Sequence, residues 1–166
     1  SRWLGEDLIE GLIERYGGRV IVEDPTGFEK LSGRSAIFVA NHQVQIESIL
    51  VTHLLAGLTR RPLVTMANAK HERGWVGTLL GRLFRYPGCR TPRNIVYFDP
   101  ATPATMFDIL GRLRSDLAAG TRSFFVHADG TRARSCRQPA ARISSLFLDL
   151  AVEIEIPIVP VRFVGG

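Results

Sequence analysis

Runs of β-branched and aromatic residues recur along the chain at intervals that predict six β-strands. These runs are Arg19–Val22, Ala36–Ala40, Leu63–Met66, Ile95–Phe98, Ser123–Val126 and Ile156–Val164. Between most of them, apolar residues repeat every three or four positions, which is the spacing of an amphipathic helix. The alternation predicts an α/β fold with a mostly parallel central sheet flanked by helices.

Five segments carry the helical spacing. They are Trp3–Tyr16, about Glu47–Leu58, Trp75–Phe84, a segment from Pro103 to just before Gly120, and about Ala140–Val152. The chain has 166 residues, of which 45% are hydrophobic. That length suits a single core, so we expect one domain over residues 1–166. The first and last residues, Ser1 and Gly166, suggest a domain excised from a larger multienzyme.

The formal net charge is +5, and 19 of the 21 basic residues are arginines. The arginines are spread along the chain without an aromatic-basic platform, so we expect no nucleic-acid partner. Glycine-rich phosphate loops of the GxGxxG or GxxxxGK type are absent, which argues against nucleotide binding. Cys89 and Cys136 lack zinc-ligand spacing, and we expect no metal. Two cysteines are too few for a disulfide framework, which favours a reducing compartment, and no apolar stretch is long enough to span a bilayer. We expect a cytoplasmic domain with the option of peripheral membrane contact.

Two loops follow predicted strands at the edge where parallel sheets bind their ligands. The first is Asn41–Glu47, in which Glu47 stands five residues after His42. If the loop turns so that the two meet, the carboxylate would hold one imidazole nitrogen and leave the other to deprotonate a hydroxyl. Without a GxSxG elbow, that hydroxyl would belong to a substrate. The alternative is that His42 caps the helix and Glu47 complements its dipole.

The second loop, His127–Arg134, combines a turn-forming Gly130 with Thr131, Arg132 and the acid Asp129. Backbone amides and guanidinium groups in such a turn can bind an anion together. The alternative is an Asp-Gly turn with solvated arginines. His127 is either a further polar group of the site or a histidine that ends a strand.

Together the loops resemble the signature blocks of the glycerolipid acyltransferases, the family that contains 1-acylglycerol-3-phosphate acyltransferase. The segment from His42 to Glu47 resembles the family's NHxxxxD block, and Asp129–Arg132 resembles its EGTR block. Ile95–Asp99 looks like the central hydrophobic block, and Ile156–Val161 looks like the proline-containing last block. The resemblance covers residues 36–163.

The resemblance implies an acyltransferase in which His42 deprotonates an acceptor hydroxyl for attack on an acyl thioester and Glu47 orients the histidine. Asp129, Gly130, Thr131 and Arg132, with Lys70, would bind the substrate, and Pro160 would line the acyl pocket. The implied donor is acyl-CoA or an acyl carrier protein, the implied acceptor a lysophospholipid-type alcohol, and no further cofactor is needed.

The chain departs from the family pattern at several positions. Glu47 replaces an aspartate and Asp129 replaces a glutamate, so each acid moves by one methylene. Pro100 stands where the central block should close with an arginine, which removes a phosphate anchor worth roughly 1.5 to 3 kcal/mol. His127 and Ala128 replace a phenylalanine and a proline. Two alternatives stay open on the sequence: a thioesterase that uses water as acceptor, and a non-catalytic docking domain for acyl chains or carrier proteins.

Overall fold

The computed structural model describes residues 4–12, 14–15, 21–23, 28–31, 33–42, 47–84, 94–102, 104–127 and 144–163. Its helices are α1 (Leu4–Leu12), α2 (Glu47–Thr59), α3 (Gly74–Leu83), α4 (Ala104–Ala118) and α5 (Leu146–Glu153). Its strands are β1 (Ile37–Ala40), β2 (Leu63–Asn68), β3 (Ile95–Phe98), β4 (Ser123–His127) and β5 (Ile158–Val161). Two short 3-10 turns, η2 (Phe28–Leu31) and η3 (Ala69–His71), were not predicted.

The five strands form one sheet in the order β3-β2-β4-β1-β5, and every neighbouring pair is parallel. Ala40, the last residue of β1, lies opposite His127 of β4 on one side and opposite Val161 of β5 on the other. The carboxyl ends of these three strands therefore meet at one edge of the sheet. This arrangement confirms the predicted α/β fold with a parallel sheet.

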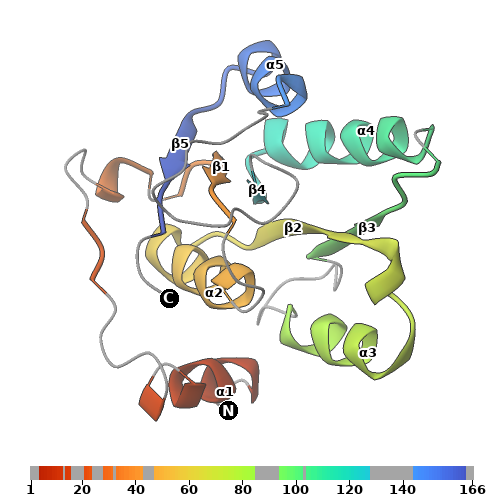
Figure 1. The fold of residues 1–166 in the computed structure, drawn as a ribbon. Coiled ribbons are helices and arrows are strands. Elements are labelled where there is room, and N and C mark those ends of the chain that lie inside the picture. Colours follow the sequence, from red (N-terminus) through yellow and green to blue (C-terminus); the bar gives the residue numbers. More distant parts are fainter. Residues whose placement is uncertain are drawn as a thin grey trace.

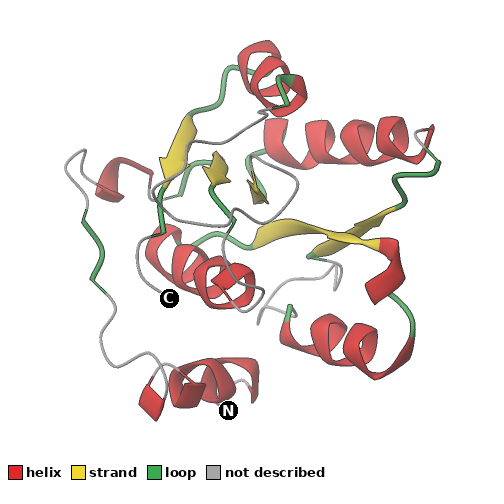
Figure 2. Cartoon of the chain, viewed as in Figure 1, coloured by secondary structure: helices red, strands yellow, loops and turns green. Residues whose placement is uncertain are grey.

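The helices cover both faces of the sheet (Figures 1 and 2), with α4 and α5 on one side and α1, α2 and α3 on the other. Side chains alternate along each strand, so neighbouring residues point to opposite faces. Ile37 and Phe124 pack with residues of α4 and α5. Phe38 and Phe125, the next residues along, pack with Leu55 of α2. Two-sided burial explains why the strands are continuously apolar.

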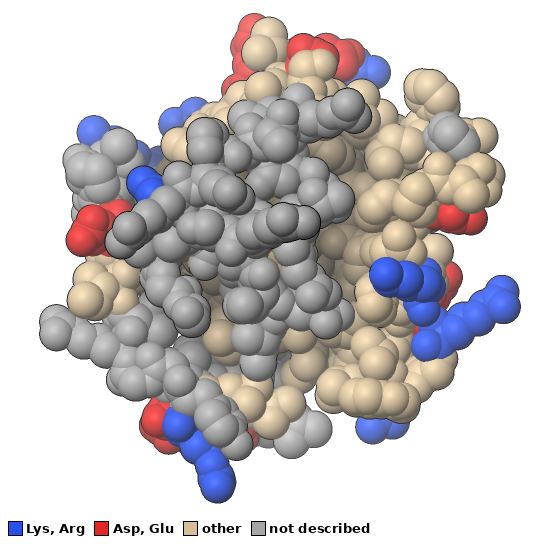
Figure 3. Space-filling view, viewed as in Figure 1, with Lys and Arg blue, Asp and Glu red and all other residues tan. Residues whose placement is uncertain are grey.

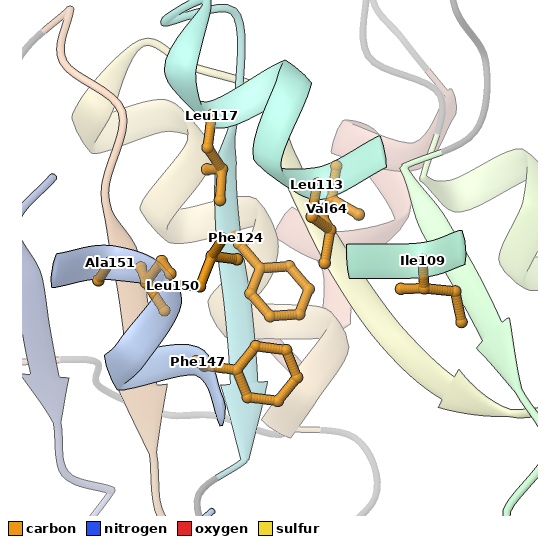
Figure 4. Packing of buried hydrophobic residues seen from close by; sticks show 9 residues of the cluster. Val64, Ile109, Leu113, Leu117, Phe124, Phe147, Leu150 and Ala151 are labelled. Carbon is orange, nitrogen blue, oxygen red and sulfur yellow. The ribbon is translucent and has the colours of Figure 1, made fainter. Parts of the chain in front are cut away.

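The core beneath α4 and α5 is built around an aromatic pair (Figure 4). The rings of Phe124 and Phe147 lie 5.1 Å apart at an interplanar angle of 42°. Leu113 and Leu117 of α4 belong to the same cluster, and Phe124 is fully buried. The aromatic contact links β4 to α5 and so holds the strand that leads to the second loop.

The five predicted helices are present, with different ends. Residues 144–145 precede α5 without helical structure, and residues 140–143 lie outside the described part of the chain. The strand predicted at Arg19–Val22 is wrong at its described residues. Residues 21–23 have irregular backbone, and Ile21 is 64% exposed. A strand needs a partner, and this segment joins no strand of the sheet. The β-branched residues of this segment favour an extended backbone, but this local propensity alone does not make a strand.

Gly77 lies where α3 passes close to the chain that enters it. A Cβ atom at this position would stand 1.9 Å from the carbonyl oxygen of Glu72 and 2.5 Å from its carbonyl carbon. Both atoms belong to the backbone, so they cannot rotate away as a side chain would. Only glycine fits here without moving the connection between η3 and α3.

We expect Gly77→Ala to lower the free energy of unfolding by about 1 to 3 kcal/mol, because the new methyl group collides with the backbone of Glu72. Gly81→Ala in the same helix is the matched control, since nothing lies within 4 Å of its Cβ position. That change should stabilise the protein by about 0.5 to 1 kcal/mol through helix propensity. Urea unfolding of both variants measures the difference, and equal effects would contradict the close approach.

Candidate active site

His42 lies two residues beyond the end of β1, at the carboxyl edge of the sheet, and is partly buried. The preceding residue, Asn41, anchors this segment to the end of β5. Its Oδ1 accepts the backbone N–H of Phe163 at 2.7 Å, and its Nδ2 donates to the carbonyl oxygen of Phe163 at 3.2 Å. The side-chain amide of Asn41 thus pairs with both backbone groups of one residue, Phe163, which fixes where the chain leaves the sheet before His42.

The ring of His127 packs against the ring of His42. Their centroids lie 4.0 Å apart and the planes are inclined by 24°, a stacked arrangement. His127 is the last residue of β4 and stands opposite Ala40, so the register of the two strands brings the histidines together. Phe125 contacts His127 edge-on, with centroids 5.0 Å apart and an angle of 84°.

Both nitrogens of His127 have polar partners. Nδ1 lies 3.0 Å from the carbonyl oxygen of Asn41, and Nε2 lies 2.7 Å from Oγ of Ser48. A carbonyl oxygen only accepts hydrogen bonds, so Nδ1 carries a proton. In the neutral ring, Nε2 then accepts the hydroxyl hydrogen of Ser48. Ser48 belongs to the first turn of α2, where its own carbonyl oxygen accepts the hydroxyl of Thr52.

Several predicted site residues lie outside the described part of the chain. Asp129, Gly130, Thr131 and Arg132 fall in the undescribed residues 128–143, and Glu47 is described only as the first backbone position of α2. Their roles therefore stay predictions. The structure does place His127, the last described residue before this segment, beside His42.

Lys70 and Pro160, the other predicted substrate-binding residues, belong to parts of the fold that β4 and β1 separate in the sheet. Lys70 is exposed in η3, directly after β2, and its amide donates to Oδ1 of Asn68 at 3.0 Å. Pro160 lies on β5 opposite Val39 and is exposed. Their roles in binding the substrate stay predictions.

Two further titratable side chains, those of Tyr97 and His53, have surroundings that indicate a structural role. Burial raises the pKa of the Tyr97 phenol, and the nearby carboxylate of Glu72 raises it further. His53 of α2 has one ring nitrogen 2.7 Å from the carbonyl oxygen of Ile49 and the other 2.9 Å from that of Leu83. These contacts tie α2 to the end of α3, away from the sheet edge that holds His42.

In the described part of the chain, no three His, Cys, Asp or Glu side chains are grouped so that they could hold a metal ion. No helix in the same residues has the length and apolar character needed to cross a membrane.

The family model for acyltransferases matches residues 19–164. The chain belongs to the acyltransferase family. In this acyltransferase the matched region begins after α1 and takes in the whole parallel sheet, including the segments around His42 and His127. No curated protein and no solved structure matches the chain.

The sequence did not indicate the contacts of Asn41 and Ser48. Ser48 and His127 are separated by 79 residues, and Asn41 and Phe163 by 122. The only available signal is that His127 stands where the resembled family has phenylalanine. Its polar ring there is either a group of the site or the end of a strand, and its partners depend on strand register.

We expect Asn41→Ala to lower the free energy of unfolding by about 2 to 3 kcal/mol, because two partly buried backbone groups of Phe163 lose their partner. Asn41→Asp keeps the acceptor for the Phe163 amide but turns a second oxygen toward the Phe163 carbonyl, so it should be destabilising too. Asn68→Ala is the control, since Asn68 bonds only within its own turn, and it should cost about 1 kcal/mol or less. Urea unfolding gives all three values; equal losses in the two alanine variants would contradict the anchoring role.

Proposed function

We propose that this acyltransferase moves a fatty acyl chain from an acyl thioester, borne by coenzyme A or an acyl carrier protein, to the hydroxyl of a lysophospholipid-type acceptor such as 1-acylglycerol-3-phosphate. The observation that carries the proposal is the placement of His42. It stands at the carboxyl edge of the sheet, beside the strand that leads to Asp129–Arg132, within a chain that matches the acyltransferase family. A histidine there can act as general base on a bound alcohol.

In this mechanism a ring nitrogen of His42 takes the proton of the acceptor hydroxyl as its oxygen attacks the thioester carbonyl. The carbonyl is restored when the carbon–sulfur bond breaks, and the imidazolium returns its proton to the leaving thiolate. The products are an ester and a free thiol. Glu47, at the start of α2, would orient the ring and stabilise the imidazolium. No metal or further cofactor takes part.

The substrate phosphate would lie between two neighbouring strand ends. Thr131 and Arg132 follow β4, and Lys70 follows β2, which pairs directly with β4. Cations from both segments would meet an anionic acceptor at one edge of the sheet. Pro100, where the resembled family has arginine, is exposed in the turn after β3 and provides no charge. We therefore propose a weaker dependence on the acceptor phosphate than a complete set of anchors would give.

The acyl chain would extend toward β5, where Pro160 and the partly exposed Ile158 offer apolar surface. On the face drawn in Figure 3, basic side chains lie at separate places, several of them near acidic ones. The net charge of +5 suits the phosphates of coenzyme A or an acidic carrier protein. A cytoplasmic location with peripheral membrane contact fits a water-soluble donor and a lipid acceptor.

We expect His42→Ala to lower turnover by about 10²- to 10⁴-fold, the usual contribution of a general base. Glu47→Gln should lower it by about 10²-fold or more, because the base loses its orienting carboxylate. The assay follows thiol release from acyl-CoA in the presence of lysophosphatidate. Glu153→Gln is the control: that carboxylate pairs with Arg114 at 2.6 Å on the surface between α4 and α5, and its loss should leave turnover unchanged. Full activity of Glu47→Gln would remove Glu47 from the mechanism.

A panel of donors and acceptors tests the reaction class. The donors are acyl-CoA and the acylated form of an acyl carrier protein. With each, thiol release should depend on added lysophosphatidate. The phosphate-free monoacylglycerol should support slower release. Release that proceeds equally without any alcohol would identify a thioesterase instead. If no thiol is released while the His42→Ala variant still binds the acyl donor, the domain would be a docking module.

A further inference from the structure

His127 stacks on His42 but takes no part in the catalytic mechanism proposed above. We propose that His127 is a positioning residue, held by Asn41 and Ser48, whose ring face fixes the imidazole of His42 in the orientation needed to receive a proton. This inference rests on the proposed function, in which His42 is the base.

The first step is that His127 is itself fixed. Its Nδ1–H donates to the carbonyl oxygen of Asn41, its Nε2 faces the Ser48 hydroxyl at 2.7 Å, and Phe125 packs edge-on against its ring. These three contacts come from the β1 end, from α2 and from β4. A ring bonded at both nitrogens has no freedom to flip, so its plane is determined by the surrounding elements.

The second step is that this plane determines the plane of His42. With centroids 4.0 Å apart and planes 24° from parallel, one face of the His42 ring is covered by His127. That face is closed to substrate, so in the proposed mechanism the proton is received at the edge of the ring, where the nitrogens are. The carbonyl group that His127 bonds belongs to Asn41, the neighbour of His42, so ring and backbone of the base are both restrained by the same side chain.

Three variants separate the contributions. His127→Ala removes both the aromatic ring that covers His42 and the hydrogen bonds of that ring. His127→Phe keeps an aromatic ring without the hydrogen bonds, and Ser48→Ala removes only the hydrogen bond to Nε2 of His127. We expect His127→Ala to lower kcat by about 10- to 100-fold with KM within about twofold, since a displaced base impairs the reaction rather than binding. His127→Phe should recover most of the loss, and Ser48→Ala should lower kcat by a few-fold.

A spectroscopic readout makes the test independent of activity. The ring protons of His42, assigned by comparison with His42→Ala, should be shifted upfield by the neighbouring ring in the parent protein and in His127→Phe. They should move back toward ordinary positions in His127→Ala. If His42→Ala retains turnover, the proposed function fails while these shifts still report on the stack.

Three results would overturn the inference. The first is a kcat within twofold of the parent for His127→Ala, and the second is His127→Phe being as impaired as His127→Ala. The third is an acyl adduct on Ser48, detected by intact-mass measurement after incubation with acyl-CoA without acceptor. Such an adduct would make Ser48 a nucleophile and His127 its base, so we expect the mass to be unchanged.

Discussion

The parallel, in-register pairing of β1 with β4 and β5 is the constraint on which the rest of the site depends. Because Ala40 lies opposite both His127 and Val161, the three strands end together, and the residues that follow them meet at one edge. Burial of Phe38 and Phe124 on opposite faces makes this register costly to change, since a shift by one residue would turn each apolar side chain to the wrong side.

Backbone groups are prominent in the anchoring of the site. Asn41 pairs with the backbone N–H and C=O of Phe163, and His127 bonds the carbonyl oxygen of Asn41. These contacts join residues at the ends of adjacent strands. If His42 acts as the base in the mechanism we propose, a segment held in this way limits the movement of the base before substrate arrives, which favours proton transfer.

Family membership establishes acyl transfer for this chain, whereas we propose that its departures from the pattern of the glycerolipid acyltransferases affect selectivity. Glu47 is one methylene longer and Asp129 one methylene shorter than the acids of that pattern, and Pro100 carries no charge where the pattern has arginine. His127 adds a second imidazole beside His42, and Ser48 of α2 is a hydrogen-bond partner of that imidazole. The chain thus combines the family's sheet with polar groups that the pattern alone would not place there.

The fold could be predicted from the sequence because it depends on local periodicity: apolar runs formed β1 to β5, and amphipathic spacing formed the helices between them. The same local reasoning failed at Ile21, whose β-branched neighbourhood has no strand to pair with. The motifs around His42 likewise predicted a site at the carboxyl ends of the strands, because the motifs directly follow strands that pair in parallel. Only the tertiary structure decided that His127 stacks on His42 and bonds Asn41 and Ser48, because contacts across 79 or more residues depend on strand register and helix packing, which no local pattern encodes.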